Sequence, residues 1–204
     1  NKEKVYSTAV KVYVPKYLCL IQPNDFMPNP ILKSARLQLA LVSLADLAFI
    51  HELLSHEETD RYNTLGTPVS MDETTEIVAP WINENQKDTI VNYTWMISSL
   101  HNQEPIGLFG LKLSNDKYRR GEVWYKIHPN QWKKGYATEA LERVIQFAFD
   151  DCNLHRIQAG CAVDNIGSIR VLEKVGMIKE GRGRKLLPLR TGWSDNFEFS
   201  ILES

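Results

Sequence analysis

Hydrophobic residues recur with two different periods near the start of the ordered pattern in this chain. Leu37, Leu39 and Leu41 alternate with other residues, as the buried positions of a strand do. From Leu44 to Phe49 the apolar spacing becomes helical. A strand is therefore predicted to lead directly into a helix.

The segment TTEIVAPWINENQ, residues 74–86, predicts a second helix. Its apolar residues follow helical spacing, and Asp72 and Glu73 just before it are typical of a helix start. Pro80 lies within the pattern, and proline both removes a helical hydrogen bond and clashes with the preceding turn. We therefore expect Pro80 to end or kink this helix.

The second half of the chain predicts a sheet with helices packed on it. Residues 91–97 alternate with a period of two, and the segments PIGLFGLKL and GEVWYKI continue as strands of an antiparallel meander. The later elements are a helix that begins near Gly135, a strand over residues 155–163, a helix over 166–175 and a last strand over 196–202. The fold class is therefore α+β (mixed α/β), with the sheet at its centre.

Residues 1–33 differ from the rest of the chain. Their β-type alternation runs to about residue 21, and four prolines lie among residues 15–30. Prolines at this density exclude regular helix and favour an extended arm. We expect an N-terminal extension over residues 1–33 and one domain over residues 34–204.

Composition and charge narrow the possible partners. The chain has 204 residues, 43% of them hydrophobic, which suffices for one domain with a substantial core. Its 24 basic and 25 acidic residues leave a net charge of −1, so no overall field favours nucleic acid or an anionic membrane. The three cysteines lack C-x-x-C spacing and fit a reducing cytoplasm better than a disulfide framework. No apolar run approaches the roughly 20 residues that cross a bilayer.

The segment NQWKKGYATEAL forms an unusual start to an amphipathic helix. A strand that ends at Ile127 and a helix that begins near Gly135 bring unpaired backbone N–H groups and the positive end of the helix dipole together. Gly135 lets the backbone approach a ligand, while Lys133 and Lys134 add positive charge. The turn predicts an anion site, and a solvated turn with surface lysines is the alternative.

Three sequence blocks occur in a characteristic order. The pattern [QR]-x-x-G-x-[GA] falls on residues 132–137, with Trp132 in place of the usual Gln or Arg. N-x-x-S-x-x-x-L-E-K-x-G-M begins at Asn165, and W-x-D begins at Trp193, ahead of the last strand. Residues 34–204 thus resemble the GNAT superfamily of acetyl-CoA-dependent N-acetyltransferases. The resemblance is to its RimJ/RimL-like, ribosomal-protein-alanine branch in particular, which often carries Trp at the first motif position.

The resemblance implies a twisted, mostly antiparallel central sheet whose fourth and fifth strands, GEVWYKI and HRIQAGCAV, splay apart. The pantetheine arm of acetyl-CoA would lie in that gap, bound by the backbone of Ile127 much as another strand would be. Asn165 would hold the arm from the other side, although it also suits a helix N-cap. The pyrophosphate would bind at Trp132, Lys133, Lys134, Gly135, Tyr136, Ala137 and Thr138.

Acetyl transfer needs a neutral amine, and the departing thiolate benefits from a proton. The resemblance implies Glu122 as the base, acting directly or through water, and Ser168 as the acid, with Tyr125 and Tyr136 less favoured. The alternatives are an ion pair between Glu122 and an arginine of the preceding turn, and a capping role for the Ser168 hydroxyl. Trp193 and Asp195 are predicted to brace the last strand beside the acceptor cleft.

The expected activity is direct acetyl transfer to a primary amine in a ternary complex, without a metal. The acceptor is either a protein N-terminal α-amine, as in the branch resembled, or a small molecule such as an antibiotic, a polyamine or an amino acid. A non-catalytic acyl-CoA-binding domain is the alternative from another class. A homodimer is implied by the resemblance only.

The segment HELLSH is similar to the zinc-protease motif H-E-x-x-H. Its His51 and His56 are five residues apart, however, so they lie about 140° apart around a helix. We therefore expect no metal shared between these two side chains.

Overall fold

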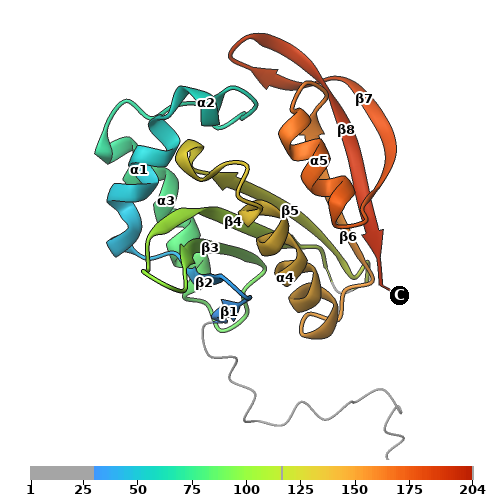
Figure 1. Ribbon diagram of the computed structural model, residues 1–204, viewed down its shortest axis with the longest axis horizontal. Coiled ribbons are helices and arrows are strands. Elements are labelled where there is room, and N and C mark those ends of the chain that lie inside the picture. The colour runs from blue at the N-terminus through green and yellow to red at the C-terminus, as the bar shows by residue number, and fades with distance from the viewer. Residues whose placement is uncertain (1–29, 116, 204) are drawn as a thin grey trace, which may run out of the picture.

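The computed structural model describes residues 30–115 and 117–203, which form one eight-stranded sheet with helices on both faces (Figure 1). The strand order is β1-β2-β3-β4-β5-β6-β8-β7. All neighbouring strands are antiparallel except β5 and β6, which are parallel. The strands are β1 (Leu32–Lys33), β2 (Leu37–Leu41), β3 (Asn92–Ser99), β4 (Pro105–Leu113), β5 (Arg120–Ile127), β6 (Arg156–Ala162), β7 (Ile178–Leu189) and β8 (Gly192–Leu202).

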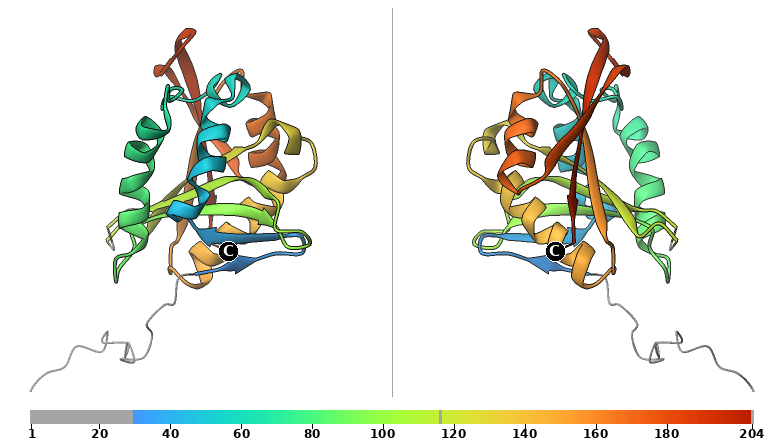
Figure 2. Two further views of the ribbon diagram at one scale, coloured as in Figure 1. Left: turned by 90° about the vertical axis from the view of Figure 1, so that its left-hand side faces the viewer. Right: turned by 90° about the vertical axis from the view of Figure 1, so that its right-hand side faces the viewer.

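The helices divide into two layers, and Figure 2 shows one on each side of the sheet. Because successive residues of a strand point to opposite faces, β3 contributes to two cores. Trp95 packs into the core beneath α4, whereas Met96 packs with α1 and α3. The helices are α1 (Leu47–Ser55), α2 (Glu57–Asp60), α3 (Met71–Asn85), α4 (Tyr136–Asp150) and α5 (Ile166–Lys174), with 3₁₀ turns at Leu44–Asp46 and Pro129–Gln131.

The sheet opens between β5 and β6. Only three residue pairs join these strands, from Arg120 and Arg156 to Glu122 and Gln158. Beyond Glu122 the two strands diverge, although β5 continues to Ile127 and β6 to Ala162. The predicted fold, with its splayed pair of strands, is confirmed; the pair becomes β5 and β6 because β1 precedes the strands that the pattern predicted.

Some elements differ from those that the hydrophobic pattern predicts. Helix α3 does not end at Pro80 but continues to Asn85, with Ser70 capping its start and Val78 and Ile82 buried on either side of the proline. Strand β7 was not predicted, and its mostly exposed residues explain why no apolar alternation marks it. The last strand begins at Gly192, four residues earlier than expected.

Strand β1 lies next to the expected boundary between arm and domain. Its Leu32 is buried and pairs with Leu39 of β2. Residues 1–29, which hold most of the expected arm, lie outside the described residues. Among the helices that the structure describes, none is long and apolar enough to span a membrane.

Candidate active site

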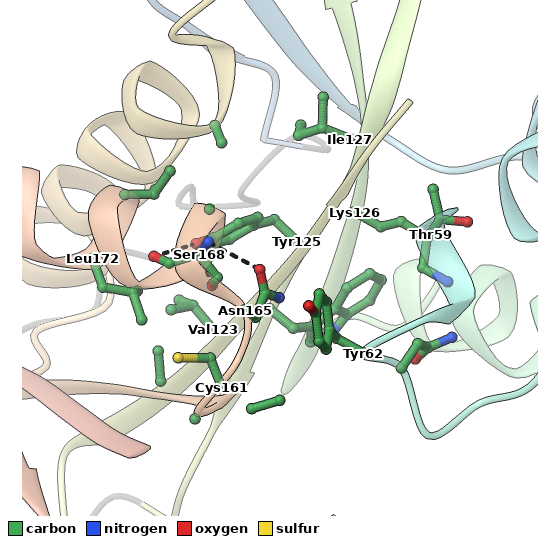
Figure 3. Close-up of a pocket in the computed structure, with 18 of the residues that line it drawn as sticks. Thr59, Tyr62, Val123, Tyr125, Lys126, Ile127, Cys161, Asn165, Ser168 and Leu172 are labelled. Atoms are coloured by element: carbon green, nitrogen blue, oxygen red, sulfur yellow. Dashed lines mark hydrogen bonds between the residues drawn. The ribbon is translucent and has the colours of Figure 1, made fainter. Parts of the chain in front are cut away.

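A cavity of about 1450 Å³ opens where β5 and β6 diverge. Its walls come from β5, β6, the turn after α2, the start of α4, the first turn of α5 and β8. Figure 3 shows lining residues from β5, β6, α5 and the segment around α2. Lys134 does not line it, and its ammonium group donates to Gln131 Oε1 at 2.8 Å. The predicted site residues that do line it are Glu122, Ile127, Trp132, Lys133, Gly135, Tyr136, Ala137, Thr138, Asn165 and Ser168.

Strand alternation gives β5 two different faces. Val123 and Ile127 point into the core beneath α4, so Glu122, Trp124 and Lys126 point to the opposite face. The Trp124 ring confirms this direction, because its centroid lies 5.7 Å from that of Trp81 on α3. Glu122 therefore faces the side of the cavity that α2 and α3 enclose.

The Glu122 carboxylate is exposed and forms no ion pair with any residue in the described part of the chain. The two arginines that precede it have other partners. Arg119 donates to the backbone and side-chain oxygens of Asn153 at 2.7 Å, and the Arg120 guanidinium lies over the Tyr118 ring. Glu122 is thus left as an exposed carboxylate at the point where the strands separate.

The backbone groups of Ile127 point into the gap between the strands. The His128 amide donates to the Ile106 carbonyl at 2.9 Å, so Ile127 and Gly107 form a non-hydrogen-bonded pair between β4 and β5. The polar backbone groups of Ile127 must then face away from β4. Its carbonyl accepts from Trp132 Nε1 at 2.7 Å, which leaves only its N–H group for a ligand.

Helix α4 begins at a glycine in the left-handed conformation. Gly135 is its N-cap, with φ of +82°, a value that glycine adopts without strain. Its carbonyl accepts from the Glu139 amide, so the N–H groups of the three residues between them have no helical acceptor. These groups line the cavity and point out of the positive end of the helix dipole. The geometry is that of an anion site.

Arg36 is a charged neighbour of this helix start that the sequence pattern did not reveal. Its guanidinium donates to the Lys134 carbonyl at 3.1 Å, pairs with Glu139 at 2.6 Å and lies 4.7 Å from the centre of the Tyr136 ring. These contacts tie the segment before β2 to the turn before α4. Since about 100 residues separate the partners, no local signal could have indicated them.

The first turn of α5 carries Asn165 and Ser168. Asn165 is the N-cap, and its Oδ1 accepts from the Ser168 amide at 3.1 Å. The capping alternative for Asn165 is therefore correct, and its side-chain NH₂ group has no acceptor within residues 30–115 and 117–203. The Ser168 hydroxyl does not cap the helix, because it lies 2.8 Å from the Tyr125 hydroxyl of β5 (Figure 3). Burial raises the pKa of Tyr125, so its phenol stays neutral.

Comparison with known proteins decides the family. Residues 36–178 match the family model "Acetyltransferase (GNAT) domain". The chain belongs to the GNAT family. It is accordingly an N-acetyltransferase, and enzymes of this family take the acetyl group from acetyl-CoA.

Curated relatives of this GNAT domain include two from Bacillus subtilis. The uncharacterized N-acetyltransferase YoaA is 32% identical over 74% of this chain and 85% of that protein. The uncharacterized N-acetyltransferase YnaD is 42% identical over 40% of this chain, and the match spans about half of YnaD (48%).

Two solved GNAT structures show how the fold compares. Spermidine N-acetyltransferase from Vibrio cholerae in complex with CoA and spermine has a TM-score of 0.73 and 25% identity, over 83% of this chain and 96% of that one. The ribosomal-protein-S5-alanine acetyltransferase from Vibrio fischeri has a TM-score of 0.75 over 85% of this chain and 96% of that one. Because its identity is 18%, this second similarity shows the fold alone.

Lys126 is a further residue of the GNAT cavity that the sequence did not single out. Its Nζ is buried and has no hydrogen-bond partner in residues 30–115 and 117–203. Burial lowers its pKa to about 8, and the negative charge of Asp60 opposes that shift only in part. Strand alternation places Lys126 on the same face of β5 as Trp124, but nothing in the sequence pattern indicated that its amine is buried.

His51 of α1 and His56, the residue that follows this helix, have different neighbours. His51 Nδ1 lies 2.7 Å from Thr74 Oγ1 of α3, whereas His56 approaches Glu52 and His128. The latter three offer atoms within 4.8 Å of one another. His128 Nδ1 accepts from the Asn130 amide, so its proton is on Nε2, which donates to Glu52 at 3.2 Å. In this tautomer His128 and Glu52 form a hydrogen-bonded contact beside His56.

Asp195 braces the β7–β8 hairpin of this GNAT domain. Its carboxylate accepts from Arg182 Nε at 2.8 Å and from the Lys185 amide at 2.9 Å, which joins β8 to β7. Trp193 is 61% exposed, and neither residue lines the cavity. Asn196 and Glu198 are the residues of β8 that do.

Proposed function

We propose that this chain transfers the acetyl group of acetyl-CoA directly to a primary amine of a small molecule, in a ternary complex and without a metal. The observation that carries the proposal is the divergence of β5 and β6 after Glu122, which opens a single cavity. The start of α4, the open edge of β5, the Ser168 hydroxyl and the Glu122 carboxylate all face this cavity, and direct transfer can use this set of groups.

In this proposal the cofactor binds along the open edge of β5. The Ile127 N–H donates to the pantetheine arm as a neighbouring strand would, and the side-chain NH₂ of Asn165 donates from the other wall. The pyrophosphate binds the free N–H groups of Tyr136, Ala137 and Thr138, since a helix start attracts negative charge. Lys133 adds positive charge within the cavity. The Trp132 indole donates to the Ile127 carbonyl and so holds the turn against β5. Lys134 does not line the cavity and contributes through its hydrogen bond to Gln131.

The proposed proton transfers use two groups on opposite sides of the acetyl group. Glu122 accepts the proton of the acceptor amine, directly or through water, so that the neutral nitrogen attacks the thioester carbonyl. Backbone N–H groups of β5 stabilise the resulting oxyanion. When the carbon–sulfur bond breaks, the Ser168 hydroxyl gives its proton to the departing thiolate and regains one from water, while the product nitrogen releases its extra proton to water. The 2.8 Å contact of Ser168 with Tyr125 keeps the hydroxyl oriented.

A small-molecule acceptor is favoured over a protein N-terminus. The Vibrio cholerae relative named as a spermidine N(1)-acetyltransferase is 28% identical over 72% of this chain, which supports a small amine as the acceptor. A protein N-terminal acceptor and membership of the RimJ/RimL-like branch have weaker support, namely Trp132 in the first motif and a shared fold at 18% identity. A protein N-terminus remains a second possibility for the acceptor.

The test is thiol release from acetyl-CoA in the presence of single small amines, followed by detection of the acetylated amine by mass spectrometry. We expect amine-dependent release that requires both substrates at once. Acetylated enzyme formed from acetyl-CoA alone, and discharged later by an amine, would contradict direct transfer. Thiol release that occurs only with peptides would indicate that the acceptor is a protein N-terminus.

A further inference from the structure

The acceptor side of the cavity holds two buried hydrogen-bond donors without acceptors. The first is Lys126 Nζ, on the face of β5 that also carries Glu122. In Figure 3 the Lys126 side chain extends from β5 toward Thr59, at the end of the cavity that the α2 segment forms. Within the described residues no carboxylate, carbonyl or hydroxyl oxygen bonds to it.

The second donor is the side-chain NH₂ of Asn63, in the turn that follows α2. Asn63 Oδ1 accepts from the Leu65 amide at 3.2 Å, which fixes the orientation of the carboxamide. Its Nδ2 is buried and has no partner in the part of the chain that the structure describes. Asn63 and Lys126 both line the cavity.

Three acidic side chains of this part of the molecule each have a partner for one carboxylate oxygen. Glu58 pairs with His56 at 3.5 Å, and Glu198 accepts from Asn196. Asp60 is 3% exposed, pairs with Arg190 at 3.4 Å and does not line the cavity. Two buried acceptors of the described residues, Asp60 Oδ1 and Asn196 Oδ1, also have no partner. Of the unpartnered groups that line the cavity, on Lys126, Asn63 and Asn196, only that of Lys126 carries a charge, and the charge is positive.

A buried donor without an acceptor costs free energy, and a buried ammonium group costs more than a neutral one. Native proteins keep few such groups, and one that lines a binding cavity is explained if a ligand supplies the missing acceptor. A carboxylate fits best, because it accepts several hydrogen bonds and carries the charge that compensates an ammonium group.

We propose that the acceptor amine carries a carboxylate, which Lys126 and Asn63 bind while the amine faces Glu122. This inference rests on the proposed acetyl transfer and specifies its substrate as an amino acid rather than a polyamine. A polyamine would bring a second positive charge toward Lys126 and would leave both donors unsatisfied.

Matched pairs of acceptors test the inference. Glycine, β-alanine and γ-aminobutyrate differ from methylamine, ethylamine and propylamine by the carboxylate alone, and spermidine represents the polyamines. We expect the enzyme to favour at least one amino acid over its matched amine by 10-fold or more in kcat/KM. Equal values within every pair, or a preference for spermidine, would overturn the inference while leaving acetyl transfer established. Acetylation of no amine at all would overturn the proposed function as well.

Variants then assign the preference to Lys126. In Lys126→Met, KM for the favoured amino acid should rise about 10-fold or more, while kcat and the kinetics of the matched amine change little. Lys126→Glu should invert the preference toward the amine. Lys33→Met, which removes an exposed lysine of β1 remote from the cavity, is the control and should match the wild type. Unchanged acetyl-CoA affinity verifies that each variant is folded. A preference that survives in folded Lys126→Met would contradict the assignment.

Discussion

The hydroxyl groups of Tyr125 and Ser168 lie 2.8 Å apart and join β5 to the first turn of α5 across the cavity. The backbone of Ser168 is also held in place, since its amide donates to the side chain of the N-cap Asn165. The contact therefore bridges the gap that opens beside β5 beyond Glu122. The contact leaves the Ser168 hydroxyl directed by a neutral phenol rather than free to rotate.

Tyr125→Phe should lower kcat by about 2- to 10-fold, the worth of one hydrogen bond. Acetyl-CoA affinity should change little, because the backbone of β5 is retained. Steady-state kinetics and calorimetric titration measure the two quantities separately. Tyr118→Phe is the matched control, since Tyr118 is exposed and does not line the cavity. An unaltered kcat would mean that this contact only supports the fold.

Glu122→Gln and Ser168→Ala should each lower kcat by about 100-fold, which is the lower end of the contribution from general acid or base catalysis. Neither change should weaken acetyl-CoA binding. Gln keeps the size of Glu122, so a fall in rate would reflect the lost basic group. Glu142→Gln, on the exposed face of α4, controls for a simple loss of charge. If Glu122→Gln turns over at the wild-type rate, another group or solvent is the base.

Gly135→Asp should abolish acetyl-CoA binding, because a carboxylate at the start of α4 repels phosphate and occupies its place. Gly135→Asn is the matched comparison, since Asn has the same shape, tolerates positive φ and carries no charge. We expect calorimetry to give an affinity at least 10-fold weaker for the Asp variant than for the Asn variant. Equal affinities would show that the phosphates do not bind at this turn.

Lys126→Met should stabilise the protein at neutral pH, because it removes a buried ammonium group that has no hydrogen-bond partner among the described residues. The lysine has a pKa of about 8 in the folded state and a higher one in the unfolded state. Its destabilising effect, of about 3 kcal/mol, is therefore complete below pH 8 and disappears as the pH rises toward 10.5.

Denaturant unfolding of wild type and Lys126→Met across this pH range measures the effect. The wild type should gain stability relative to the variant as the pH rises from 8 to 10.5. A constant difference over that range would show that Lys126 has an ordinary pKa and a partner. A less stable variant at neutral pH would show that the lysine stabilises the fold.

Local sequence features predicted the parts of the site that depend on neighbouring residues. The strand that ends at Ile127, the glycine at 135 and the helix after it form one short segment, so its pattern alone predicted an anion site there. Strand β7 was missed for a related reason. Its residues are mostly exposed on both faces, so its sequence has no apolar alternation to detect.

Contacts between distant segments could not be predicted in the same way. Tyr125 and Ser168 are 43 residues apart, and Arg36 reaches the start of α4 from about 100 residues away. Lys126 presents a different difficulty. The strand alternation gives the face to which it points, but its burial depends on how the α2 segment folds over β5. Only the tertiary structure reveals that its amine has no partner.

Calorimetric titration of the purified chain with acetyl-CoA, with NADH and ATP as controls, tests the central claim most directly. We predict micromolar affinity for acetyl-CoA, equivalent to about −8 kcal/mol, and none of comparable strength for the two controls. Absence of acetyl-CoA binding by the folded chain would contradict the claim that the gap between β5 and β6 is a cofactor site. The roles assigned to Glu122 and Ser168 would then have to be withdrawn.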